Sequence, residues 1–100
     1  MDQRALIVRL EMSLADYAGA DATAREVILA GLSWPTDTMS GYWQGLAVDW
    51  IEQGAAVDAE MVALVNVIAT TAKLPQQLRH KAREIVRRWQ SENHNFQFRQ

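Results

Sequence analysis

The stretch DAEMVALVNVIATTAKLP, residues 58–75, decides the fold of this 100-residue chain. Apolar residues recur in it every three or four positions, which is the spacing of an α-helix face. Asp58 is suited to cap this helix, because its carboxylate accepts backbone amide hydrogens that the first turn leaves unpaired. Pro75 starts the next helix, since proline is favoured at a first helical position. A helix over about residues 59–73 that is apolar on most of its surface must lie deep in the core.

The same spacing extends over nearly the whole chain, and helix-breaking residues divide it into about five helices. The expected helices cover about residues 3–18, 22–33, 39 or 40–53, 59–73 and 75–91. Asp21 is expected to cap the second helix, Pro35 to end it, and Gly54 to end the third. We therefore predict an all-α fold, a compact single-domain bundle of about five helices over residues 1–92. A short C-terminal tail, residues 93–100, follows it.

The net charge of −2 hides an uneven distribution. Residues 1–73 hold ten acids and four bases, whereas residues 74–100 hold six bases and two acids. This near-balance excludes a simple polybasic protein. The chain has no cysteine, which excludes disulfide scaffolds and thiolate metal sites. It has neither an apolar run of roughly 18 residues nor the order of a signal peptide, so we expect a cytoplasmic protein that does not enter membranes.

The residue types that perform catalysis show no productive arrangement. His80 and His94 are 14 positions apart, and no third residue stands at a metal-ligand spacing. No serine is placed beside an oriented histidine, and no glycine-rich loop is present to hold a phosphate. We therefore expect no enzyme activity, no catalytic residue, no bound metal and no cofactor.

Acidic residues gather around the loop near residue 37 and on the two central helices. Asp37, Asp49 and Glu52 are candidates for contact with a basic surface of a protein partner. The alternative is that these acids only keep the surface solvated.

Three apolar residues are further candidates for partner binding: Val8, Met12 and Trp34. Val8 and Met12 belong to a second, weaker apolar stripe of the first helix. Trp34 stands at the corner before Pro35, and tryptophan is enriched among residues that dominate binding energy. Packing of Trp34 in the core is the alternative.

Arg79, Arg83 and Arg87 repeat every fourth position along one flank of the last helix. Guanidinium groups suit carboxylates and phosphates. Three interpretations stay open: a solvated face, an acidic partner surface (on another protein or within this chain), or nucleic acid. The sequence pI of about 5.6 disfavours nucleic acid.

Gly41 and Gly45 stand four positions apart on the third helix. Glycine is unfavourable in a helix interior, so its presence there needs a reason. Close approach of another helix, from within the fold or from a partner, is the interpretation we favour.

In size, all-α build and mild acidity, the chain resembles small phage-encoded inhibitors. Anti-CRISPR proteins that block a type I surveillance complex are one such group, and small bacterial anti-activators are another. The resemblance is one of the whole chain and rests on no motif, so no residue is carried over. It implies action by occlusion, in which a compact body docks on a large complex, such as a ribonucleoprotein, and blocks a functional surface.

We therefore predict a non-catalytic protein-binding module that acts as an inhibitor or regulator. Two alternatives remain. One is a small nucleic-acid-binding regulator that uses the basic last helix, and the other is a structural homodimer.

Overall fold

A computed structural model of the chain describes residues 3–17, 21–35 and 41–93. Its α-helices are α1 (Gln3–Ile7), α2 (Ala24–Leu32), α3 (Tyr42–Glu52), α4 (Ala59–Ala69) and α5 (Gln76–Glu92). Two short 3₁₀ helices, η1 (Val8–Glu11) and η2 (Leu14–Asp16), follow α1. The described residues form no strand. The predicted all-α bundle of about five helices is thus confirmed.

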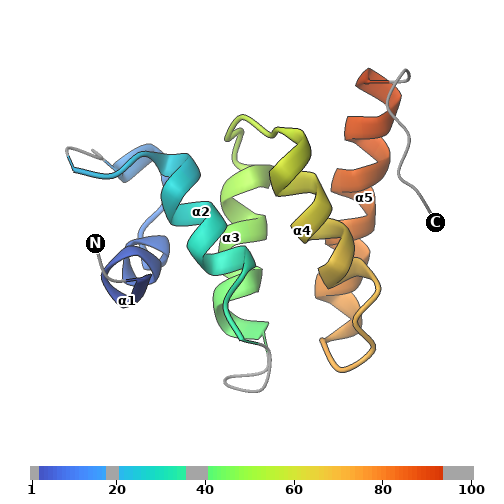
Figure 1. The fold of residues 1–100 in the computed structure, drawn as a ribbon, viewed down its shortest axis with the longest axis horizontal. Helices are drawn as coiled ribbons and strands as arrows, with labels where there is room; N and C mark the ends of the chain where they lie inside the picture. Colours follow the sequence, from blue (N-terminus) through green and yellow to red (C-terminus); the bar gives the residue numbers. More distant parts are fainter. Residues whose placement is uncertain (1–2, 18–20, 36–40, 94–100) are drawn as a thin grey trace.

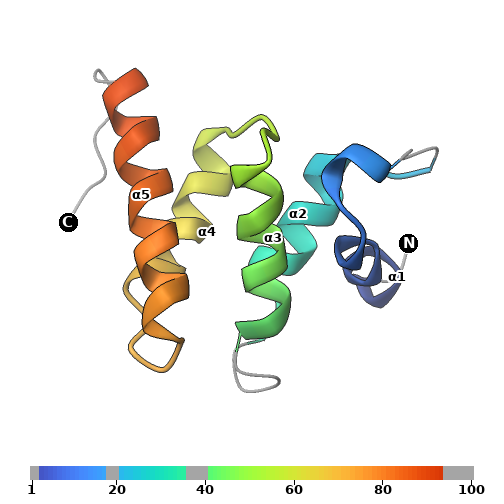
Figure 2. The same ribbon diagram turned by 180° about the vertical axis from the view of Figure 1, so that it is seen from behind.

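The helices form two layers, and α2 packs against α1, α3 and α4. Helix α4 also packs against α5. Figure 1 looks onto α2 and α4, and the opposite view in Figure 2 looks onto α3 and α5, with α1 at one edge. The Cα radius of gyration is 13.0 Å, as expected for one compact domain of this length.

The core is apolar and is supplied by every helix. Helix α4 contributes Met61, Val62 and Val65, which have no exposed surface. Helix α5, which packs against α4, contributes Ala82, whose short side chain is also fully buried. Trp50 of α3, only 1% exposed, is the bulkiest side chain in this core. Met61, Val62 and Val65 therefore lie in the core as their spacing predicts, but the helix ends at Ala69 instead of near residue 73.

Three of the predicted helix boundaries are confirmed by local geometry. The Asp58 side chain accepts a hydrogen bond from the Met61 amide at 2.9 Å, which caps α4. Gly54 follows α3 with φ at 116°, a conformation that favours glycine. Pro75 directly precedes the first residue of α5. The tail beyond Asn93 lies outside the described residues.

The predicted cap of the second helix is wrong. Thr23, not Asp21, precedes α2, and its side chain accepts the Glu26 amide at 3.1 Å. The Glu26 carboxylate in turn accepts the Thr23 amide at 3.0 Å, completing a capping box. Asp21 instead accepts two hydrogen bonds from Arg9, at 2.7 and 3.0 Å.

The predicted first helix, residues 3–18, is also wrong beyond Ile7. The chain continues as η1, becomes extended at Met12 and Ser13, and turns again in η2. Trp50 of α3 and Gln53, the residue that caps the C-terminus of α3, bind backbone groups in this segment. The Trp50 indole N–H donates to the Met12 carbonyl at 2.9 Å, and Gln53 Oε1 accepts the Leu14 amide at 2.8 Å. Tertiary hydrogen bonds have therefore replaced those of a continuous helix.

Candidate protein-binding surface

Three of the four exposed large apolar side chains among the described residues lie around Glu11. Val8 is 52% exposed, Met12 44% and Tyr42 41%. The Tyr42 hydroxyl donates a hydrogen bond to Glu11 Oε2 at 2.8 Å, which joins α3 to η1. Val8 and Glu11 are three residues apart in a 3₁₀ helix, so their side chains project in the same direction. We call Val8, Glu11, Met12 and Tyr42 the η1–α3 surface.

Contacts of Trp50 and Tyr17 hold the η1–α3 surface in place. The Trp50 ring lies beneath the extended segment and holds the Met12 carbonyl. The Tyr17 ring packs against Trp50, with ring centroids 5.3 Å apart, and the Tyr17 hydroxyl donates to the Ala22 carbonyl at 2.7 Å. These contacts fix Val8 and Met12 relative to α3, so their exposure is not the result of a loose end.

Electrostatics at the η1–α3 surface are set by Glu11. Its carboxylate accepts the Tyr42 hydrogen bond, and this bond raises the pKa of Tyr42 above its ordinary value of 10.0. The Tyr42 ring also meets the edge of Trp43, with centroids 4.9 Å apart. The surface thus combines three apolar side chains with one carboxylate, a composition suited to a partner that offers apolar groups and a cation.

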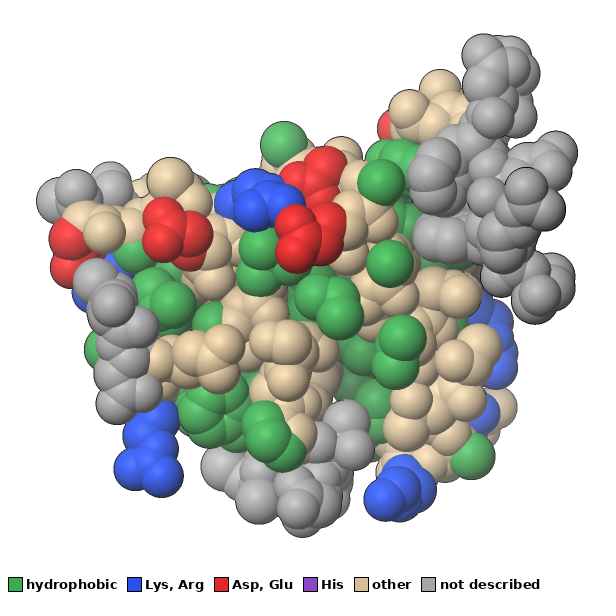
Figure 3. Space-filling model, viewed as in Figure 1, with side chains coloured by type: hydrophobic (Ala, Val, Ile, Leu, Met, Phe, Trp, Pro, Cys, Tyr) green, Lys and Arg blue, Asp and Glu red, His purple; other side chains and the backbone are tan. Residues whose placement is uncertain are grey.

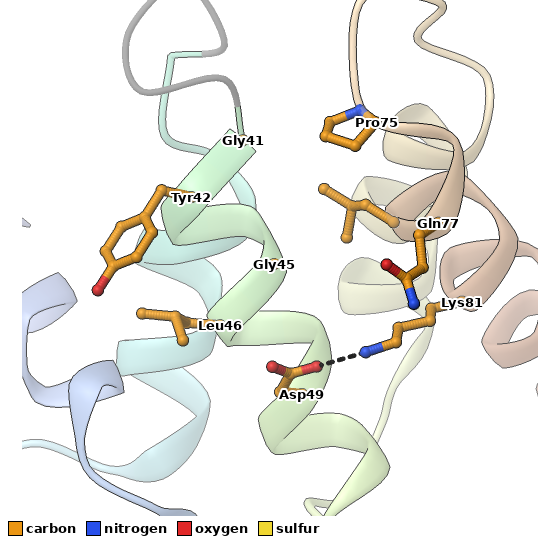
Figure 4. Close-up of a pocket in the computed structure, with 9 residues that line it drawn as sticks. Gly41, Tyr42, Gly45, Leu46, Asp49, Pro75, Gln77 and Lys81 are labelled. Atoms are coloured by element: carbon orange, nitrogen blue, oxygen red, sulfur yellow. Dashed lines mark hydrogen bonds and ion pairs between the residues drawn. The ribbon is translucent and has the colours of Figure 1, made fainter.

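A groove of about 400 Å³ lies between α3 and the start of α5, on the side of α3 away from the Tyr42 ring. We call it the α3–α5 groove. Its lining residues are Gly41, Tyr42, Gly45, Leu46, Asp49, Pro75, Gln77, Leu78 and Lys81. Figure 4 shows Gly45 between the two helices and Asp49 and Lys81 pointing toward one another across the groove. Tyr42 and Leu46 point to the opposite side of α3, toward the N-terminal segment.

Asp49 and Glu52, both predicted to bind a partner, share one cation of α5. Lys81 Nζ lies 3.2 Å from Asp49 Oδ1 and 3.8 Å from Glu52 Oε1. Its hydrogen bond to Asp49 is the main reason that the pKa of Lys81 is raised. All three side chains keep between 37% and 42% of their surface exposed. Two carboxylates against one ammonium leave this end of the groove negative.

The arginines of α5 do not meet these acids. Lys81 stands on the flank of α5 that faces α3, about 160° around the helix from Arg83. Arg79 is half-buried, and its Nε donates to the Leu74 carbonyl at 3.1 Å, so it fastens the turn before α5. Arg83 is exposed, and Arg87, also exposed, pairs with Glu84 at 2.7 Å. Arg79, Arg83 and Arg87 therefore lie apart from Asp49 and Glu52, which α5 meets through Lys81.

The remaining predicted site residues lie elsewhere. Trp34 is half-buried against the core. Its backbone carbonyl accepts a hydrogen bond from the side-chain amide of Gln44, a residue that is only 1% exposed. Asp37 lies outside the described residues. The structure thus leaves Val8 and Met12 exposed on η1 and the residue after it, and brings Asp49 and Glu52 together at Lys81 on the other side of α3.

The opposite layer offers a contrasting surface. Figure 3 looks onto α2 and α4 and shows acidic side chains along one edge and an uncharged centre. The acids Asp58 and Glu60 of this layer are paired with Arg25, at 2.6 and 2.5 Å. Val67 of α4, 58% exposed, is the fourth exposed large apolar residue and provides a matched control position.

Glu11, Tyr42 and Lys81, whose polar groups define these surfaces, were not singled out as partner-binding residues from the sequence. Lys81 carried a usable signal, because it lies on the flank of its helix opposite Arg79, Arg83 and Arg87. Tyr42 and Glu11 carried none, since their contact depends on the break in the first helix.

Two further features of the described residues concern function. None of their helices combines the length and apolar character needed to cross a bilayer. No group of three or more His, Asp or Glu side chains among them is placed to hold a metal ion. Comparison with known proteins finds no matching family model, no similar curated protein and no similar solved structure.

Proposed function

We propose that this chain is a cytoplasmic, non-catalytic protein-binding module that inhibits or regulates a larger complex by covering one of its surfaces. The observation that carries the proposal is the η1–α3 surface. It gathers Val8, Met12 and Tyr42 around one carboxylate and holds them on a buried tryptophan. Aromatic and methionine side chains are enriched in the centres of protein interfaces, whereas lone exposed apolar residues are ordinary.

The partner surface that fits is apolar and basic. Glu11 lies on one side of α3, and Asp49 and Glu52 lie on its other side with Lys81 as their neighbouring cation. Complementary charge speeds association and disfavours acidic partners. A basic surface that normally holds nucleic acid within a ribonucleoprotein has this chemistry. We propose that the chain covers such a surface.

Capture experiments with matched variants test the proposal. Immobilised wild-type protein, the double variant Val8→Ser with Met12→Ser, and the control Val67→Ser are each exposed to host extract, and bound proteins are identified by mass spectrometry. We expect a partner that wild type and Val67→Ser retain and the double variant loses. Identical capture by all three proteins, or loss with Val67→Ser alone, would contradict the proposal.

A second candidate function rests on the exposed outer face of α5. Arg83 and Arg87 lie four residues apart on this face, and their guanidinium groups are suited to bind phosphate groups. Arg83→Glu with Arg87→Glu tests this candidate by DNA and RNA gel shift at low salt. A wild-type shift that the double variant abolishes would favour a nucleic-acid regulator over the protein-binding module.

A further inference from the structure

Gly45 leaves space in the α3–α5 groove that the fold itself does not use. A Cβ atom built on Gly45 would meet no atom within 4 Å. The neighbouring glycines differ. A Cβ on Gly31 would lie 2.6 Å from Leu10 Cδ1. A Cβ on Gly41 would lie 2.7 Å from Leu74 Cδ2, and the backbone of Gly41 has φ at 85°. Gly31 and Gly41 therefore serve the fold, whereas Gly45 costs helix stability and gives the fold no closer packing.

The groove has an apolar part and a negative end. Leu78 of α5 and Pro75, the residue before α5, line the groove together with Gly45 and lie nearest Gly41. Asp49 and Glu52 lie one and two turns further along α3 from Gly45. Each of these carboxylates is more than one-third exposed, although both already approach Lys81. Their remaining lone pairs can accept hydrogen bonds from a second cation. An acidic occupant would instead add a third carboxylate beside these two.

We propose that the α3–α5 groove binds a basic amphipathic helix of the protein partner. An apolar side chain of that helix fills the space over Gly45, and an arginine or lysine next to it joins Asp49 and Glu52. This inference rests on the proposed function and adds the chemistry of the partner. A helix is the fitting occupant because the groove lies between two helices, and apolar residues at every third or fourth position fill such grooves.

A second copy of this chain does not supply that occupant. Helix α5 is its exposed basic helix, but the exposed positions of α5 carry only polar or charged side chains. These positions are Gln76, Gln77, His80, Arg83, Glu84, Arg87, Arg88, Ser91 and Glu92. A copy docked through this face would leave the apolar part of the groove empty.

Two synthetic helical peptides test the inference. The first has an apolar face of leucine and alanine flanked by arginines, and the second carries glutamate in place of each arginine. Binding is followed by amide chemical shifts of the ¹⁵N-labelled full chain and by fluorescence anisotropy. We expect the arginine peptide to bind and to shift the amides of Gly45, Asp49 and Lys81. Absence of binding, equal binding of both peptides, or shifts confined to other residues would overturn the inference.

Variants locate the binding in the groove. Gly45→Leu fills the space and should weaken the arginine peptide about tenfold or more, whereas Ala63→Leu, the matched exposed position on α4, should leave affinity unchanged. Asp49→Asn with Glu52→Gln should also weaken it. Circular dichroism verifies folding, and Gly45→Ala replaces Gly45→Leu if the leucine variant does not fold. Unchanged affinity in these variants would overturn the inference.

The same variants separate this inference from the proposed function. If Gly45→Leu still captures the partner that Val8→Ser with Met12→Ser loses, the groove inference is wrong and the protein-binding module stands. If neither variant changes capture, both are wrong.

Discussion

The indole nitrogen of Trp50 donates a 2.9 Å hydrogen bond to the carbonyl oxygen of Met12 and so ties α3 to the N-terminal segment. Trp50 is 1% exposed, which makes this bond a buried one. It holds the chain in the extended conformation that follows η1, with Met12 at ψ 164°. The placement of Val8 and Met12 on the η1–α3 surface therefore depends on a core residue.

Trp50→Phe should loosen the N-terminal segment more than the rest of the fold. The variant removes the donor, leaves the Met12 carbonyl unpaired and reduces core volume, so we expect a loss of roughly 2 kcal/mol in unfolding free energy. Hydrogen exchange should accelerate most at the amide of Leu14, which donates to Gln53 Oε1 directly after α3. Trp89→Phe is the control, and equal acceleration at Leu14 in both variants would contradict this role of Trp50.

Alanine substitutions at two glycines should have opposite effects on stability. Gly45→Ala adds a methyl group in open space and should raise the free energy of unfolding by up to about 1 kcal/mol, or several degrees in Tm. Gly31→Ala places Cβ against Leu10, Ala47 and the Trp43 carbonyl and should lower it by about 1–3 kcal/mol. Thermal melts followed by circular dichroism measure both. Changes of the same sign would contradict the packing described for these glycines.

Acid should destabilise the fold through three paired carboxylates. The Arg9 hydrogen bonds lower the pKa of Asp21, the Thr23 amide lowers that of Glu26, and Arg25 lowers that of Asp58. A carboxylate whose folded pKa is depressed stabilises the fold at pH values above its unfolded pKa of about 4. This stabilisation is lost as the pH falls through the lower folded value.

Asp58→Asn isolates one of these contributions. Asparagine still caps α4 but loses the charge that pairs with Arg25, so the variant should be less stable by about 0.5–1 kcal/mol at neutral pH. The difference from wild type should vanish in strong acid. Tm measured across the acid range tests this, and a constant difference at all pH values would show that the ion pair is not its source.

The pKa of the Tyr42 hydroxyl should lie above its ordinary value because the hydroxyl donates a hydrogen bond to the Glu11 carboxylate. Glu11→Gln removes the negative charge and should bring the Tyr42 pKa back toward 10.0. NMR titration of the aromatic ring resonances resolves Tyr42 from Tyr17. A Tyr42 titration that is the same in both proteins would show that the two side chains do not meet in solution.

The sequence predicted the parts of the fold that depend on local chemistry. Asp58, Gly54 and Pro75 mark helix boundaries through capping and backbone conformation, and the structure confirms them. The first helix and the role of Asp21 were predicted wrongly, because hydrogen bonds from α3 and from Arg9 decide them. Contacts between distant residues cannot be recognised from local spacing alone.

The candidate surfaces were predictable only in part. Val8 and Met12 were recognised as a second apolar stripe, and both are exposed. Asp49 and Glu52 were recognised as neighbours, but Lys81 as their cation requires the relative placement of α3 and α5. Gly41 and Gly45 were both predicted to lie on the third helix. Gly41 instead precedes α3 as its N-cap with φ at 85°, whereas Gly45 lies inside the helix with open space beside it.

The most direct test of the central claim is a footprint of the captured partner on the ¹⁵N-labelled chain. Amide chemical shifts and line widths are compared with and without the purified partner. Protein binding through α3 predicts the largest changes at Val8–Met12 and Tyr42–Asp49, with α4 around Val67 unaffected. Changes centred on Val67, or on Arg83 and Arg87, with the η1–α3 surface unaffected, would contradict it.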